Sequence, residues 1–150
     1  MRRNAKGTPI DIEPYREDLR KYLEDQEGLV AAWLYGSYGT SYQTPLSDLD
    51  LAVLYRWDRL PDLGEEGGLV MDLTAILHED DLSITVLNRS PAIFQFRVIE
   101  SGPPIVCRDP VALADFIESV ISHHADFIVD HKRFTQEYDE ALVEQYGHDR

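Results

Sequence analysis

Two aspartates one residue apart, Asp48 and Asp50, follow the pair Gly36-Ser37 after ten intervening residues. Residues two apart on a strand point to the same face, so both carboxylates would face one side. Hard oxygen donors in that arrangement hold Mg²⁺, which neutralises triphosphate charge and aligns an in-line displacement. Gly36 lets the backbone approach a phosphate, and Ser37 with the amides after it can donate hydrogen bonds. The spacing predicts a phosphate-binding site beside a metal site.

Two apolar runs must position these residues. Leu29–Tyr35 is continuously apolar, has the length of a strand and stops at Gly36, which is typical of a buried central strand. Leu49–Tyr55 is a second strand with the aspartates at its start. On its own, Asp-x-Asp also fits a turn cap followed by a surface residue. Joined to an apolar strand that ends in Gly-Ser, it favours nucleotide chemistry.

The remaining elements surround this pair of strands. Apolar periodicity and turn residues predict a helix from Asp11 to about Gln26, a loop over Pro61 to Gly68, a short helix Leu69–Leu77, a strand Leu82–Leu87, a helix Pro91–Glu100, and a short strand Ile105–Cys107. A helical stripe then continues from Val111 to about Tyr146. At ~54 Å such a helix is longer than a domain of this size is wide, so it must break or pack on a partner.

The predicted organisation is one globular domain of the α/β (α+β) class, a small mixed sheet flanked by helices. Residues 1–9 form a loose tail, 10–108 the core and 109–150 the C-terminal helical segment. The length of 150 residues suits a single core. Asn88, after the third strand, is expected to brace a loop by hydrogen bonds to backbone.

The charge is strongly negative. Twenty-eight acids against 14 Lys and Arg give a net charge of −14, which repels phosphate and argues against direct binding to nucleic acid or an anionic membrane. A basic protein partner and a high-salt cytoplasm both account for this acidity, and the sequence leaves both open. The single cysteine, Cys107, is expected to be buried, and no apolar run reaches the length of a membrane span. We expect a soluble cytoplasmic protein.

The stretch from about Val30 to Cys107 resembles the minimal nucleotidyltransferase (MNT) family, part of the polymerase-β-like superfamily, whose signature is Gly-Ser-x10-Asp-x-Asp. The later Leu87-Asn88-Arg89-Ser90-Pro91 and Glu100-Ser101-Gly102 are similar to members paired with HEPN-domain toxins. The resemblance implies an antitoxin that uses ATP and Mg²⁺, with two metal ions, to attach AMP to a tyrosine of a HEPN ribonuclease. Gly36 and Ser37 would bind the triphosphate, and Asp48 and Asp50 the metal.

The resemblance also exposes a departure. The superfamily usually carries a third carboxylate on the adjacent strand, and Ser83 occupies that position here. Asp81 lies two residues upstream on the same face, ~6.6 Å away along a strand. The third carboxylate commonly ligates the catalytic metal and can act as the base. Asp81 and Ser83 are therefore both candidate catalytic positions, and transfer is expected to be slow if neither replaces the acid.

Arg89 and, on the next helix, Arg97 are candidates to meet phosphate, although in so acidic a chain each equally suits a salt bridge. Tyr35 flanks the Gly-Ser pair, where it can pack or stack on a base. Besides the transferase, two functions remain open. One is an inactive antitoxin that neutralises its toxin by binding. The other is a small-molecule nucleotidyltransferase of the aminoglycoside type, although 150 residues leave little room for the usual acceptor domain.

Overall fold

The structure, a computed structural model, describes residues 11–35 and 49–124. Four strands form one mixed sheet in the order β3-β2-β1-β4, namely β1 (Leu29–Tyr35), β2 (Leu49–Tyr55), β3 (Leu82–Val86) and β4 (Val106–Cys107). β1 is antiparallel to both of its neighbours, β2 and β4, whereas β2 and β3 are parallel. This is the small mixed sheet that the sequence predicts.

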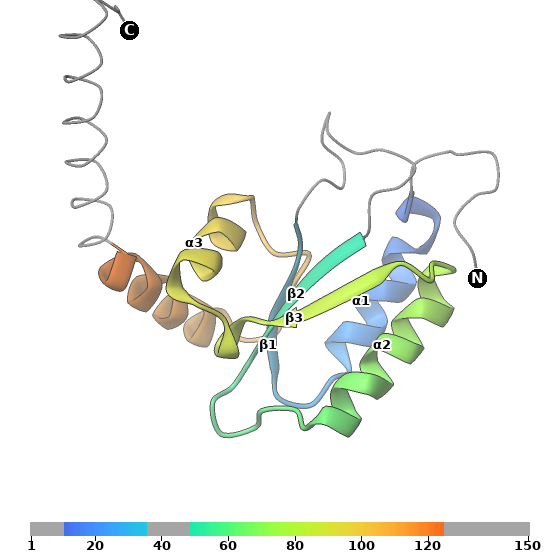
Figure 1. The fold of residues 1–150 in the computed structure, drawn as a ribbon, viewed down its shortest axis with the longest axis horizontal. Coiled ribbons are helices and arrows are strands. Elements are labelled where there is room, and N and C mark those ends of the chain that lie inside the picture. The colour runs from blue at the N-terminus through green and yellow to red at the C-terminus, as the bar shows by residue number, and fades with distance from the viewer. Residues whose placement is uncertain (1–10, 36–48, 125–150) are drawn as a thin grey trace, which may run out of the picture.

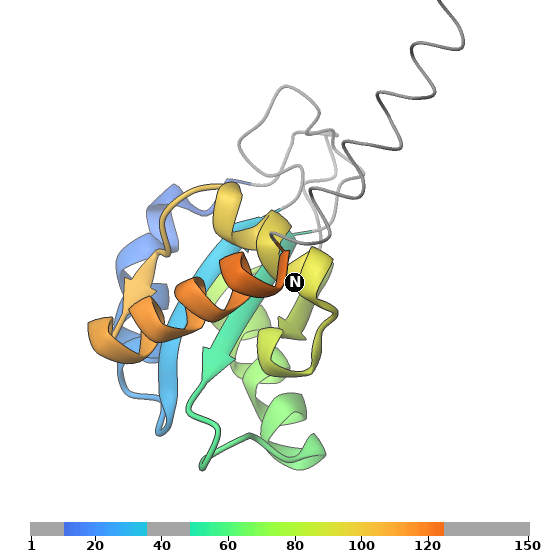
Figure 2. The ribbon, with the colours of Figure 1, turned by 90° about the vertical axis from the view of Figure 1, so that its left-hand side faces the viewer.

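Helices cover both faces of the sheet (Figure 1). On one face lie α1 (Arg16–Glu24), preceded by the 3-10 turn η1 (Glu13–Tyr15), and α2 (Leu63–Leu77). The other face carries α3 (Ala92–Glu100) and a helix over residues 110–124, which lie side by side in Figures 1 and 2. The three-layer arrangement gives the chain two apolar cores, one on each side of the sheet.

The alternation of side chains along each strand divides the residues between these cores. Leu49, Leu51 and Val53 of β2 are buried against α1 and α2. Ala52 and Leu54 face the other way, together with Trp33 of β1, toward α3 and the helix over 110–124. Because both faces are covered, β1 and β2 are apolar at nearly every position, which is why their bounds could be predicted residue by residue.

α2 begins six residues earlier than the sequence predicts, so the loop expected over Pro61–Gly68 was wrong. Asp62 caps the helix: its side chain accepts a hydrogen bond from the Glu65 backbone at 2.7 Å, and the Glu65 side chain accepts one from the Asp62 backbone. This reciprocal capping box satisfies two backbone donors at the helix start. The capping box and the burial of Leu69 keep the segment helical, although it contains glycines.

Cys107 was predicted to be buried and is instead exposed. β4 is a two-residue strand at the sheet edge, and Val106 takes the inward position. Since neighbouring strand residues point to opposite faces, Cys107 points away from the core that contains Val106, and at this edge of the sheet it is exposed.

Asn88 has the bracing role expected for it. It lies in η2 (Leu87–Arg89), just after β3 ends. Its side chain accepts a hydrogen bond from the Tyr55 N–H at 2.9 Å and donates one to the Tyr55 carbonyl at 2.8 Å. The side chain thus extends the pairing between β2 and β3 beyond their last backbone pair, Val53 with Val86.

Two further expectations concern parts of the chain outside the described residues. These are the tail over residues 1–9 and the break or partner contact of the C-terminal helix beyond residue 124. Within the described ranges, no helix has both the length and the apolar character needed to cross a membrane.

Candidate active site

A row of three polar residues crosses the sheet at the end where β1 stops and β2 starts. Asp50 pairs with Tyr35 of β1 on one side and with Ser83 of β3 on the other. Directly paired residues on neighbouring strands point to the same face, so all three side chains lie on the face that α3 covers. The register confirms that Ser83 is the residue beside Asp50 on the adjacent strand.

Tyr35 closes one side of this row. Its hydroxyl lies 3.2 Å from the Thr85 hydroxyl, and its ring meets Phe94 of α3 edge-on at 5.4 Å. Burial raises the pKa of Tyr35, the hydrogen bond with Thr85 lowers it, and the charge of Asp50 raises it. The net shift is upward, and the contacts with Thr85 and Phe94 hold the ring in place beside Asp50.

Asp81 lies one residue before β3 begins and is exposed. Its carbonyl accepts a hydrogen bond from the Leu49 N–H at 2.9 Å, and its N–H donates to the Glu79 carboxylate at 3.0 Å. The start of β2 therefore holds the carbonyl of Asp81, and the Glu79 side chain holds its N–H. The structure brings Asp50, Asp81 and Ser83 to the same end of the sheet.

Arg89 is placed elsewhere. It follows the opposite end of β3, where it pairs with Glu66 at 3.1 Å and donates to the Pro61 carbonyl at 2.6 Å. Arg89 lies six residues beyond Ser83, which pairs with Asp50. Because β3 runs parallel to β2, these six residues lead away from Asp50 toward the other end of the sheet. The structure does not bring it to the candidate site, and we do not retain it as a phosphate ligand. Arg97 is exposed on α3.

Gly36, Ser37 and Asp48 lie outside the described residues. In the sequence, Gly36 directly follows Tyr35, the last residue of β1, and Asp48 directly precedes Leu49, the first residue of β2. The predicted motif is therefore adjacent in sequence to both strands that carry the polar row. Within residues 11–35 and 49–124, no group of three His, Cys, Asp or Glu side chains forms a complete metal site. The donors present there, the carboxylates of Asp50 and Asp81 and the hydroxyl of Ser83, are the oxygen ligands that suit Mg²⁺.

Thr85 and Phe94, which contact Tyr35, were not predicted from the sequence. The signal for Thr85 was available, since it lies two residues after Ser83 and so faces the same side of β3. The contact with Phe94 depends on how α3 packs across the sheet, which local periodicity does not encode.

The comparisons with known proteins agree with this geometry. Residues 17–111 match the family described as polymerase beta, nucleotidyltransferase. A search of curated proteins found no match. Among solved structures, one similar chain comes from the tri-AMPylated Shewanella oneidensis HEPN toxin in complex with MNT antitoxin. Its identity is 19% and its TM-score 0.62, with 85% of this chain and 98% of that chain covered.

Two further toxin–antitoxin structures are also similar. One, described as a toxin–antitoxin with AMP-PNP, has 21% identity and a TM-score of 0.64, and the alignment covers 82% of this chain and 97% of that one. The other is an MntA–toxin complex whose mutant carries two aspartate-to-glutamate changes two positions apart. It has 18% identity, a TM-score of 0.63 and the same coverage. At these identities the likeness establishes the fold.

The fold and the polar row at the start of β2 define a nucleotidyltransferase domain. The family match covers more than half of the chain, and the chain belongs to the polymerase-β nucleotidyltransferase family.

Proposed function

We propose that this protein is an antitoxin that transfers AMP from ATP to a tyrosine of a partner HEPN ribonuclease. The observation that carries the proposal is the position of Asp50, the second residue of β2, on the sheet face and at the sheet end where the Gly-Ser motif joins β1. The similar folds come from toxin–antitoxin complexes, one with a tri-AMPylated toxin and one with AMP-PNP.

In this proposal Asp48 and Asp50 hold Mg²⁺, and Gly36 and Ser37 bind the triphosphate. When bound, the metal would neutralise charge on the phosphates and orient the α-phosphate for attack by the tyrosine hydroxyl. The tyrosine oxygen would form a bond to the α-phosphorus, the bond from that phosphorus to the bridging oxygen would break, and pyrophosphate would leave. Asp50 is half-buried and paired with two neighbouring strands, which fixes the face of the sheet on which its carboxylate lies. A ligand fixed in this way needs little reorganisation when the nucleotide binds.

The proton of the attacking tyrosine needs an acceptor. Ser83 lies beside Asp50, and a hydroxyl is too weak a base for this task at neutral pH. Asp81 supplies a carboxylate one residue before β3, and its backbone is held at the start of β2 by the hydrogen bond from the Leu49 N–H. We therefore propose Asp81 as the base or outer metal ligand, acting across a longer distance than an acid at position 83 would.

The test is the intact mass of the partner toxin after incubation with this protein, ATP and Mg²⁺. The expected result is a mass increase by a whole number of AMP units that disappears with Asp50→Asn. Ser83→Asp puts a carboxylate beside Asp50 and is expected to increase the rate, by up to ~100-fold if it acts as a general base. An unmodified toxin in an intact complex would refute the transferase.

The position of Ser83 also favours a second candidate, an antitoxin that neutralises the toxin by binding alone. The two functions separate in one experiment on cells that express the toxin. If Asp50→Asn protects the cells as well as the unaltered protein does, binding is sufficient. If protection is lost while the complex still forms, the transfer reaction is required.

A further inference from the structure

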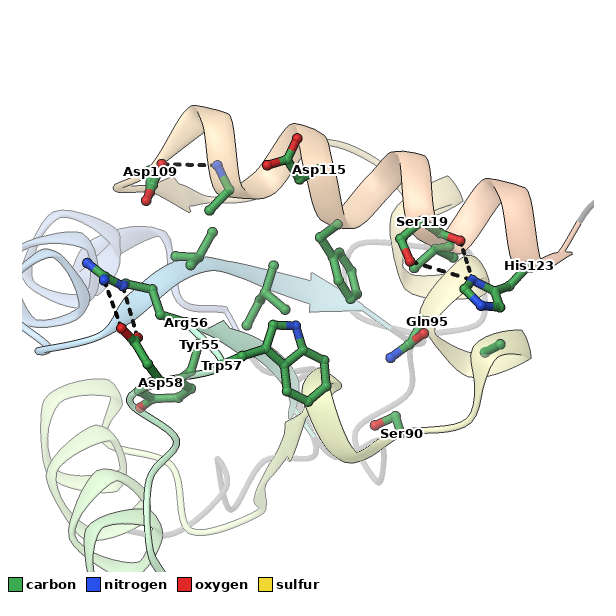
Figure 3. A pocket seen from close by; sticks show the side chains of 16 residues that line it. Tyr55, Arg56, Trp57, Asp58, Ser90, Gln95, Asp109, Asp115, Ser119 and His123 are labelled. Atoms are coloured by element: carbon green, nitrogen blue, oxygen red, sulfur yellow. Dashed lines mark hydrogen bonds and ion pairs between the residues drawn. The ribbon is translucent and has the colours of Figure 1, made fainter.

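A second cleft lies at the opposite end of the sheet from Asp50. It is lined by the end of β2, the turn after it, the start of α3 and the helix over residues 110–124, and its volume is about 850 Å³ (Figure 3). Tyr55 at the end of β2 is five residues from Asp50, about 17 Å along a strand. The cleft is therefore separate from the proposed nucleotide site, and its volume is that of a ligand-binding pocket.

The most unusual side chain in the cleft is Trp57, which is 66% exposed. Figure 3 shows its indole below the helix over 110–124, between Tyr55 and Gln95. Within the described part of the chain, the indole N–H has no hydrogen-bond partner. Large aromatic side chains are usually buried or engaged with a partner, and tryptophan is enriched among the anchors of protein interfaces. The other tryptophan, Trp33, is 1% exposed in the core.

The charges around Trp57 favour a cationic occupant. The lining contains Arg56 and three aspartates, Asp58, Asp109 and Asp115, a net charge of 1 − 3 = −2 with His123 neutral. Arg56 and Asp58 pair with each other at 3.0 Å. Asp109 accepts a hydrogen bond from the Ala112 N–H at the start of the helix over 110–124, which holds its carboxylate in place. Among the described residues, Asp115 has no ion pair.

Apolar surface lies behind these charges. Val30 and Leu54 of the sheet and Phe116 and Val120 of the helix over 110–124 line the cleft. An exposed indole, an apolar floor and an acidic rim together match a side chain with an apolar stem and a cationic head. Arginine and lysine have this form, and their cationic groups bind the face of an indole.

We propose that this cleft is a docking site for an arginine- or lysine-containing segment of a partner protein. The occupant is a protein segment rather than a single small cation, because the volume exceeds that of one side chain and the net charge of −14 attracts a basic macromolecule. The stem of one basic residue would lie on Trp57, with its head toward the acidic rim of the cleft. The inference does not depend on the proposed nucleotide chemistry.

The probe is a short peptide of alternating arginine and leucine, labelled with a neutral dye, and its control has citrulline in place of arginine. Fluorescence anisotropy with the full-length protein is expected to give saturable binding of the arginine peptide. Trp57→Ala and the citrulline peptide should each weaken binding by ~10-fold or more. Asp115→Asn should weaken it by a smaller factor and reduce its dependence on salt. Met71→Ala, at an exposed position on α2, should leave it unchanged.

Three results would overturn the proposal. The first is equal binding of the citrulline peptide, and the second is equal binding by Trp57→Ala. The third is a Trp57 emission that is already shielded from acrylamide without peptide, because another part of this chain would then occupy the cleft. Urea unfolding of Trp57→Ala, followed by circular dichroism, serves as the folding control. This control does not use nucleotide, so a failure of the docking proposal and a failure of the nucleotide site remain distinguishable.

Discussion

Replacing Asn88 by alanine should destabilise the protein, because one buried side chain supplies both hydrogen-bond partners of the Tyr55 backbone. Asn88 is 7% exposed, so water cannot easily replace it. A buried polar group left without its partner costs about 1–3 kcal/mol, and the substitution strands one donor and one acceptor. We therefore expect a loss of about 2–6 kcal/mol, with a fall in Tm of at least ~5 °C for a chain of this size.

Urea unfolding followed by circular dichroism measures this loss. Gln95→Ala is the matched control, since it removes a single hydrogen bond of 2.8 Å, to the Leu87 carbonyl, at a partly buried position. That variant should lose about 0.5–1.5 kcal/mol. If Asn88→Ala loses no more than Gln95→Ala does, Asn88 does not extend the pairing of β2 with β3, and the reasoning fails.

Three further predictions concern stability. Gly67→Ala should stabilise by about 0.5–1 kcal/mol in urea unfolding, because nothing lies within 4 Å of the added Cβ in α2. Gly28→Ala should destabilise by at least about 2 kcal/mol in the same assay, because φ is +81° and the added Cβ would lie 2.5 Å from Arg59 Cγ. An unchanged free energy of unfolding would show that the backbone at Gly28 tolerates a side chain. The hydrogen bond from Arg59 is the main cause that holds the pKa of Glu65 below its usual value of 4.5. The stability it contributes is thus present above pH 4.5 and lost as the pH falls through the lowered pKa. Glu65→Gln, which can keep the capping box, should be less stable at pH 7, and its deficit should vanish in acid. An unchanged deficit at pH 3 would refute this.

The central strands could be predicted from the sequence because both of their faces are buried. Leu29–Tyr35 and Leu49–Tyr55 are apolar almost throughout, and the predicted bounds are the observed ones. α2 could not be predicted at its start, because Gly64, Gly67 and Gly68 lower helix propensity. Its capping box and the packing of the leucines beyond them outweigh that preference. Propensity is local, whereas burial against α1 is a tertiary effect.

The candidate site could be predicted only in part. Register pairs Ser83 with Asp50, at the position where the family resemblance implied a third carboxylate. Arg89 was misplaced because proximity in sequence to β3 does not say which end of the sheet a residue occupies. Since β3 is parallel to β2, residues after it lie far from the start of β2. That direction is a property of the sheet topology and not of the residues around Arg89.

The most direct test of the nucleotidyltransferase site is calorimetric titration of the protein with AMP-PNP and Mg²⁺. Asp50→Asn keeps the size of the side chain and removes one metal-binding charge, so we expect at least ~10-fold weaker binding, the loss of one charge-assisted contact. Met71→Ala, exposed on α2, is expected to bind like the unaltered protein. Binding that requires Mg²⁺ and is lost with Asp50→Asn supports the site at the start of β2. Equal binding by Asp50→Asn would contradict it.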